Sequence, residues 1–198
     1  MTATQRLTFT DYLNLGDFDD RRYELIDGRL VELPPESGSN DFLANWLQFQ
    51  LASAGYPLDL IRTHSCEVQV PVLQARDAAN RYPDFVVLRS EHRALTRKRL
   101  TITLDMPPPR LVAEIVSPGK RSRDRDYVRK RDQYAACGIS EYWIVDPGSE
   151  AIAIFKLDKG AYREVVTLKG DTAIASPELE VMEITLKLTV ADMFAAIA

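Results

Sequence analysis

The chain has 198 residues, of which 45% are hydrophobic and 27% charged, and its net charge is −4. This length suffices for one domain with its own core and is too short for two domains of typical size, so we expect a single domain, residues 1–198. No apolar run approaches the length of a membrane span, and the first residues lack the apolar segment of a signal peptide. We therefore expect a cytoplasmic protein without a membrane partner.

The cysteines and histidines exclude several kinds of site. Cys66 and Cys137 stand alone, without the spacing of a zinc site or a disulfide framework, so we expect reduced thiols. His64 and His92 are the only histidines, which argues against a histidine-rich metal site and against a typical catalytic triad.

Basic residues gather in two stretches of this acidic chain. Residues 89–99 contain five basic residues and one acidic residue, and residues 120–132 contain seven basic and three acidic residues. Such stretches can form a surface that binds a polyanion, or a solvated helix face with many ion pairs, and charge alone favours the second interpretation. The low isoelectric point also argues against a general nucleic-acid-binding protein.

Apolar periodicity, capping residues and turn residues divide the chain into helices and strands. In the first half we expect, in order, a helix over 11–13 capped by Thr10, a hairpin of 23–26 and 29–33 around Asp27-Gly28, a helix capped by Ser39 or Asn40 and ended by Gly55, and strands over 58–62, 66–70 and 81–88. In the second half we expect strands over 101–104 and 111–118, a helix from about Arg123 to Cys137, strands over 141–147, 151–157, 162–168 and 172–175, and a final helix capped by Thr189. This order predicts an α/β or α+β fold with a mixed sheet.

Two of the expected strands carry one acid each. Asp84 lies in the strand over 81–88 and Glu114 in the strand over 111–118, and both strands are apolar on their two faces, as in a sheet covered on each side. A charge in such a strand must be paired, hydrogen-bonded or bound to a metal. A purely structural alternative is that Asp84 caps a turn after Pro83 and that Glu114 pairs with an arginine. The presence of two such acids favours a functional site.

The helix expected after the second of these strands carries a lysine on its inward face. Asp126, Lys130 and Tyr134 are spaced i, i+4 and i+8, so they lie above one another. Either Lys130 covers aromatic surface and pairs with Asp126, or its amine reaches the two carboxylates, and the spacing favours neither. Two carboxylates and a lysine suit the hydrolysis of a phosphodiester bond assisted by Mg²⁺ or Mn²⁺.

These residues resemble the PD-(D/E)XK nuclease superfamily and, more closely, its Uma-two branch of restriction-endonuclease-like proteins. The resemblance extends almost from end to end, through the hairpin motif 23–28, Pro83-Asp84, the Glu-Ile-Val-Ser-Pro motif 114–118, the Asp126/Lys130/Tyr134 helix and the motif 141–147. It implies a restriction-endonuclease-like fold, in which helices flank a mixed central β-sheet. Around a nuclease core over about 39–147, we expect an N-terminal hairpin over 22–33 and a C-terminal meander and helix over 151–198.

The resemblance also implies a metal centre. Asp84, Glu114 and the carbonyl of Ile115 are the implied ligands of Mg²⁺. The superfamily carries a lysine two residues after the second acid, where this chain has Val116. In the Uma-two branch that lysine has moved to the following helix, which makes Lys130 the third catalytic residue beside Asp84 and Glu114. Glu24 or Glu67 would complete the acidic cluster.

Three functions are compatible with these residues. The first is a Mg²⁺-dependent DNA endonuclease, with Lys120, Arg121, Arg123 and Arg125 among its phosphate contacts and, by analogy with other nucleases of this fold, a homodimer. The second is a catalytically inactive nuclease-fold protein that binds nucleic acid or protein, which Val116 and the low isoelectric point favour. The third, an enzyme acting on small phosphorylated substrates, lacks the support of a glycine-rich phosphate loop. Tyr142, Trp143 and the late strands are candidates for the dimer interface.

Overall fold

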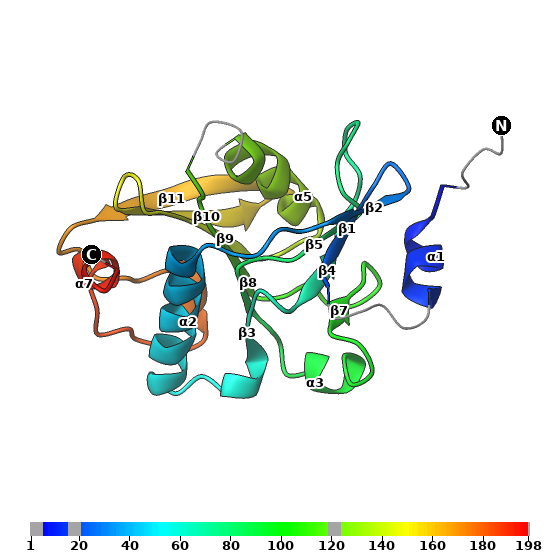
Figure 1. Cartoon of the computed structure of the whole chain (residues 1–198). Coiled ribbons are helices and arrows are strands. Elements are labelled where there is room, and N and C mark those ends of the chain that lie inside the picture. The colour runs from blue at the N-terminus through cyan, green and yellow to red at the C-terminus, as the bar shows by residue number, and fades with distance from the viewer. Residues whose placement is uncertain (1–5, 16–20, 119–123, 198) are drawn as a thin grey trace.

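A six-stranded mixed sheet forms the centre of the computed structural model, which describes residues 6–15, 21–118 and 124–197 (Figure 1). Its strand order is β11-β10-β9-β8-β6-β3, where β8 and β9 are parallel and the other neighbours antiparallel. The strands are β3 (Ile61–Thr63), β6 (Phe85–Val87), β8 (Leu111–Ile115), β9 (Glu141–Asp146), β10 (Ala151–Asp158) and β11 (Ala161–Lys169). The mixed sheet expected from the sequence is therefore confirmed.

Two smaller sheets and several helices surround the central sheet. The strands of the smaller sheets are β1 (Tyr23–Ile26) with β2 (Arg29–Glu32), and β5 (Asn80–Arg81), β4 (Glu67–Gln69) and β7 (Thr101–Ile102). The helices are α1 (Phe9–Asn14), α2 (Gly38–Ser53), η1 (Leu58–Leu60), α3 (His92–Leu95), η2 (Arg125–Lys130), α5 (Arg131–Ala136), α6 (Pro177–Val181) and α7 (Val190–Ala195). Among the described residues, no helix has both the length and the apolar character that a membrane crossing requires.

Successive side chains of a strand point to opposite faces of the sheet, so each face of the sheet has its own hydrophobic core. On one face, Leu43 and Leu47 of α2 pack in a cluster that includes Trp143 of β9. On the other face, Tyr142 of β9 and Tyr134 of α5 belong to a second cluster. Tyr142 and Trp143 are both fully buried, so the expectation that they form a dimer interface is wrong.

Several expected elements are confirmed in place and type. The β1–β2 hairpin turns at Asp27 (φ 50°) and Gly28 (φ 73°), the positive φ values that a tight hairpin turn requires. β10 and β11 form the expected antiparallel pair. Thr189 caps α7 through a capping box with Asp192.

Helix starts were less accurately predicted. Thr8, not Thr10, caps α1, and its side chain accepts a hydrogen bond from the backbone of Asp11. Ser37, not Ser39 or Asn40, caps α2. Ser and Thr residues lie so close together in both segments that the sequence does not decide which one takes the extended backbone of the cap.

Some expected strands are shorter than predicted or absent. The strand expected over 58–62 begins as the 3₁₀ turn η1, and the one expected over 172–175 is reduced to a single bridge from Ala173 to Thr189. The strand expected over 81–88 divides at Pro83 into β5 and β6, which belong to different sheets. Proline lacks the N–H that a continuous ladder needs, so the chain leaves one sheet and enters the other at this point.

His92 provides a stability prediction outside the site. Its ring is buried, its Nδ1 accepts a hydrogen bond from the backbone N–H of Arg89 (3.0 Å), and its Nε2 lies 2.7 Å from the carbonyl oxygen of Pro107. Burial lowers the pKa of His92 below 6.5. The unfolded state therefore takes up a proton first, so His92 should lower the free energy of unfolding as the pH falls from 6.5 through the depressed folded pKa.

Urea denaturation of wild type and His92→Gln at pH values on both sides of 6.5 measures this effect. The wild type should lose more stability than the variant over this interval, and an NMR titration should give His92 a pKa below 6.5. A His92 pKa above 6.5 would contradict the prediction.

Candidate active site

Asp84, the residue before β6, lies beside Glu114 of β8. β6 pairs antiparallel with β3 on one side and with β8 on the other, and the same registers continued by one residue place Asp84 between His64 and Glu114. Residues directly opposite in antiparallel strands point to the same face of the sheet. The backbone N–H of Ile115 donates to Asp84 Oδ2 at 2.6 Å, which fixes the carboxylate against β8. The expected adjacency of the two acid-bearing strands is thus confirmed.

Two side chains from the helix that follows β8 hold Glu114. Lys130 Nζ donates to Glu114 Oε2 at 2.6 Å, and the Tyr134 hydroxyl donates to Oε1 at 2.6 Å. Lys130 Nζ also lies 3.3 Å from Asp126 Oδ1. The sequence is compatible with Lys130 pairing with Asp126 or reaching the two carboxylates, and the structure shows contacts with Asp126 and with one of the two, Glu114.

The helix that carries these side chains is not the single α-helix expected from Arg123 to Cys137. Arg125–Lys130 form a π-helix, and α5 continues from Arg131 to Ala136. The wider turn of a π-helix is rare and occurs often at functional sites. Asp126 and Lys130 are both buried on its inner side. Asp126 and Lys130 therefore face inward as expected, but they lie on a π-helix and not on an α-helix.

Burial and charge act in opposite directions on the Glu114–Lys130 pair. Burial raises the pKa of Glu114 to about 8, Lys130 opposes this rise, and Asp84 and Asp126 add to it. Burial alone would lower the pKa of Lys130, but Glu114 and Asp126 outweigh it and raise that pKa above the ordinary value. Lys130 is therefore a charged ammonium group, fixed among acids and removed from bulk water.

His64 is a further neighbour of Asp84, one that no motif or spacing in the sequence indicates. Its Nδ1 lies 3.4 Å from Asp84 Oδ1 and 3.9 Å from Glu36 Oε1, and its Nε2 lies 3.7 Å from Asp41 Oδ1. Burial would raise the pKa of Asp84, but the adjacent His64 and the charge of Lys130 outweigh it and lower that pKa. His64 lies just beyond β3, so only the pairing of β3 with β6 could have indicated this contact.

The two additional acids expected in the cluster have other partners. Both carboxylate oxygens of Glu24 accept hydrogen bonds from Arg81 at 3.0 Å. Glu67 accepts hydrogen bonds from Asn80, Arg99 and Thr101 in the small sheet. The structure thus engages each acid in hydrogen bonds, including an ion pair with an arginine, and a role for either one in a metal centre stays a prediction.

The carbonyl of Ile115, an expected metal ligand, has a protein partner. The side-chain amide of Asn40, near the start of α2, donates to this carbonyl oxygen at 3.1 Å and to the Ser117 hydroxyl at 3.1 Å. A carbonyl oxygen has two lone pairs, so this hydrogen bond leaves one acceptor position.

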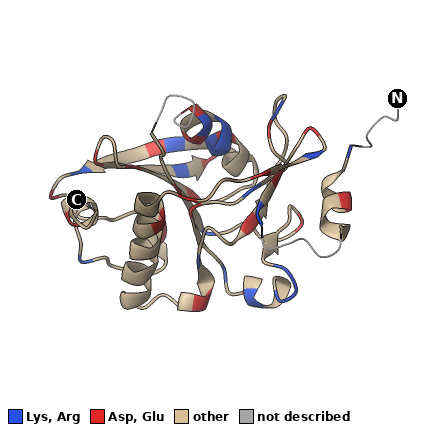
Figure 2. Ribbon diagram, viewed as in Figure 1, with Lys and Arg blue, Asp and Glu red and all other residues tan. Residues whose placement is uncertain are grey.

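The positions of the basic residues in the structure support a nucleic-acid-binding surface less than their clustering in the sequence does. Three of the expected phosphate contacts, Lys120, Arg121 and Arg123, lie outside the described residues. Arg125 pairs with Asp126 at 3.2 Å, and in the stretch 89–99 Arg93 pairs with Asp59 and Arg99 with Glu67. Figure 2 shows acidic and basic residues interspersed along the helix that ends in α5. These ion pairs favour the second interpretation of the basic stretches, in which their charges are paired with acids of the protein.

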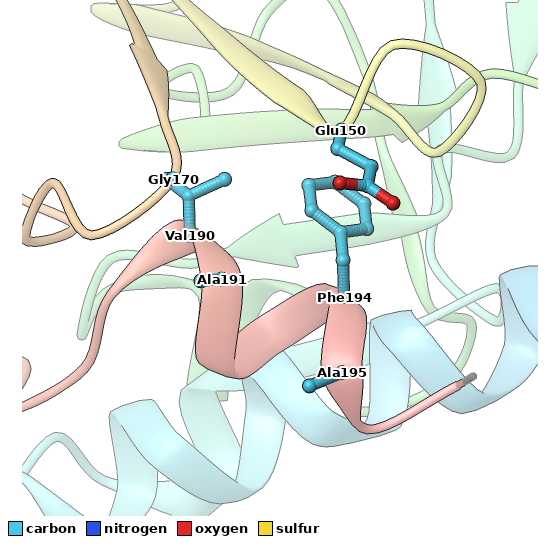
Figure 3. Close-up of a pocket in the computed structure, with 6 residues that line it drawn as sticks. All are labelled: Glu150, Gly170, Val190, Ala191, Phe194 and Ala195. Carbon is cyan, nitrogen blue, oxygen red and sulfur yellow. The ribbon is translucent and has the colours of Figure 1, made fainter.

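A small pocket lies in another part of the molecule. It has a volume of about 210 Å³ and is lined by Glu150, Gly170, Val190, Ala191, Phe194 and Ala195 (Figure 3). Its walls come from α7 and from the turns at the ends of β9 and β11. Glu150 is its one ionisable side chain, so the pocket offers no pair of groups for acid–base or metal chemistry.

Comparisons with known proteins identify the family and the fold of the chain. The family model Uma2, described as "Putative restriction endonuclease", matches residues 9–191. A solved structure described as "a putative nuclease belonging to DUF820 from Anabaena variabilis ATCC 29413" is similar over 97% of this chain and 99% of its own, with a TM-score of 0.66 and 15% sequence identity. At this identity the similarity establishes the fold alone, and the fold is the expected one. No curated protein matches the chain.

Proposed function

Because the chain belongs to the Uma2 family, described as "Putative restriction endonuclease", we propose that it is a nuclease that hydrolyses phosphodiester bonds of DNA with Mg²⁺ or Mn²⁺. The observation that supports this function best is the side-by-side placement of Asp84 and Glu114 with Lys130 bonded to Glu114. In this proposal, the two carboxylates bind the metal and Lys130 supplies a fixed positive charge.

The donor atoms of the cluster fit a hard divalent cation. Asp84, Glu114 and Asp126 are buried carboxylates, and Mg²⁺ prefers oxygen ligands of this kind. Burial, with the added charges of Asp84 and Asp126, raises the pKa of Glu114, and a cation would offset this effect. The Ile115 carbonyl would be a third donor through its remaining lone pair. When bound, the ion would polarise a phosphoryl oxygen and make coordinated water easier to deprotonate.

Lys130 has the contacts that its proposed role requires. Its ammonium group lies 2.6 Å from Glu114 Oε2 and 3.3 Å from Asp126 Oδ1, so it is charged and held in one position. A prepositioned positive charge stabilises the negative charge that develops on phosphate in the transition state. Val116, at the position where the wider superfamily has its lysine, is buried and apolar. We assign the cationic role to Lys130 for these reasons.

DNA is the proposed substrate, with phosphate contacts from Lys120, Arg121, Arg123 and Arg125. These residues precede Lys130 in the chain, and phosphate contacts of this kind position a duplex without reading its sequence. Many nucleases of this fold cut the two strands as dimers, so the proposal includes a homodimer by analogy, and light scattering would measure its mass.

Metal-dependent cleavage of supercoiled plasmid is the test. We expect nicked or linear DNA with Mg²⁺ or Mn²⁺ and intact plasmid with a chelator. Glu32→Gln is a control, because Glu32 is a half-exposed acid paired with Arg21 on β2, and it should cleave like wild type. Plasmid that stays intact with every metal would contradict the proposed nuclease activity.

Binding without cleavage is the second candidate function. Both oxygens of Glu114 already accept hydrogen bonds from Lys130 and Tyr134, which a purely structural ion pair would also show. Titration calorimetry with Mg²⁺ separates the candidates. A nuclease should give a binding heat that is lost in Asp84→Asn, whereas a pure binding module should give none.

A further inference from the structure

A second group of metal-binding side chains lies on the β3 side of Asp84. Ligand atoms of Glu36, His64 and Asp84 all lie within 4.8 Å of one another. Asp84 Oδ2 accepts the backbone N–H of Ile115 on the β8 side, while Oδ1 lies 3.4 Å from His64 Nδ1. Oδ2 of Asp84 thus lies on the side of Glu114, and Oδ1 lies on the side of His64.

The spacing of these atoms is close to that of a coordination sphere. In a tetrahedral site with metal–ligand distances of about 2.1 Å, neighbouring ligand atoms lie roughly 3.4 Å apart. His64 Nδ1 is 3.4 Å from Asp84 Oδ1 and 3.9 Å from Glu36 Oε1. All three ligand atoms lie within 4.8 Å of one another, so an adjustment of the Glu36 side chain would bring them to one ion.

His64 is a largely buried imidazole surrounded by the carboxylates of Glu36, Asp41 and Asp84. Its side chain is 11% exposed, and neither ring nitrogen has a hydrogen-bond partner among the described residues. A buried polar group without a hydrogen bond is costly, so such a group indicates an additional ligand. Nδ1 of His64 nevertheless lies near the carboxylates of Asp84 and Glu36, the groups that would bind an ion together with it.

The surrounding residues supply the outer contacts of such a site. Nε2 of His64 lies 3.7 Å from Asp41, and metal-binding histidines commonly direct their second nitrogen at a carboxylate. Arg22 donates to Glu36 Oε1 at 3.1 Å and to the backbone carbonyl of His64 at 3.1 Å. One guanidinium group therefore fixes the positions of Glu36 and His64, two of the three ligands, relative to each other.

We propose that Glu36, His64 and Asp84 bind a divalent transition-metal ion such as Zn²⁺. An imidazole nitrogen beside two carboxylates selects first-row transition metals over Mg²⁺, which prefers oxygen alone. The site deepens the proposed function, since it shares Asp84 with the nuclease centre and would make that centre a two-metal site. Its occupancy can be measured without cleavage.

NMR of the imidazole nitrogens tests the site directly, because the chain has two histidines. One equivalent of Zn²⁺ should shift the ring-nitrogen resonances of His64. The His92 ring, bonded to Arg89 and Pro107, is an internal control and should not shift. An unchanged His64 ring under Zn²⁺ would show that it is a protonated partner of the neighbouring acids, which overturns the proposal.

Calorimetry on matched variants identifies the ligands. Loss of an outer-shell partner weakens metal binding by about 10–100-fold, so His64→Asn and Glu36→Gln, which remove ligands, should weaken Zn²⁺ binding by at least that factor. Glu32→Gln, the same exchange on a half-exposed acid of β2, should bind Zn²⁺ like wild type. Zn²⁺ affinity in Glu36→Gln equal to that of wild type would overturn the assignment, and circular dichroism would confirm that each variant is folded.

Glu114→Gln separates this inference from the proposed function. Glu114 is not a ligand of the second site, so the variant should still shift His64 with Zn²⁺ although plasmid cleavage is lost. A wild-type protein that binds Zn²⁺ at His64 and cuts no DNA would contradict the nuclease alone. A wild-type protein that cuts DNA and shows no His64 shift would contradict the second site alone.

Discussion

Replacing Asp84 with asparagine should lower plasmid cleavage by about 10³-fold or more, the scale seen when a group central to the reaction is removed. Asparagine keeps the size of the side chain and can still accept the 2.6 Å hydrogen bond from the backbone of Ile115. It loses the negative charge that would bind metal at the side of Glu114 and at the side of His64. The initial rate of loss of supercoiled plasmid at saturating Mg²⁺ measures the effect.

Asp59→Asn is the matched control for this variant. Asp59 is an exposed acid paired with Arg93, so the same chemical change there should leave the cleavage rate unaltered. Asparagine forgoes the attraction of Asp84 to His64 and Lys130, but it removes the repulsion of Glu114 and keeps the Ile115 hydrogen bond, so the variant should stay folded. Circular dichroism and thermal melting check this point. Equal cleavage by Asp84→Asn and wild type would remove Asp84 from the metal centre.

The central strands and their acids could be predicted from the sequence because each depends on local pattern. Apolar runs on two alternating faces identified the strands that carry Asp84 and Glu114, and the structure confirms that these strands are neighbours. The i, i+4, i+8 spacing placed Asp126, Lys130 and Tyr134 together. The spacing could not reveal the π-helix, since the same residues also align on an α-helix.

The β3 side of the site could not be predicted because it depends on tertiary pairing. Glu36 comes from the loop before α2, and His64 from the end of β3, so no spacing in the sequence connects them with Asp84. Asn40 was a candidate helix cap, whereas the structure uses its amide to bind the Ile115 carbonyl. Side chains that bridge separate elements become visible only when the strand registers are known.

Replacing Lys130 with methionine should lower the free energy of unfolding by about 3–5 kcal/mol. This is the cost of removing one partner of a buried ion pair, because the other partner stays buried without compensation. The variant would leave Glu114 buried with its Oε2 unpaired, while Tyr134 still donates to Oε1. Methionine fills much of the lysine volume, so the loss would come from charge and not from a cavity. Urea denaturation near neutral pH measures it.

The double variant Lys130→Met/Glu114→Gln should recover most of this stability and should still cut no plasmid. With both charges removed, neither is buried unpaired, and Asp126 keeps its ion pair with Arg125 at 3.2 Å. A double variant as unstable as Lys130→Met would instead mean that Lys130 stabilises the fold through Asp126 or through packing. Buried ion pairs are weak sources of stability compared with apolar residues of the same volume. Recovered stability with cleavage absent would therefore mean that the chain retains Glu114 and Lys130 for their chemistry.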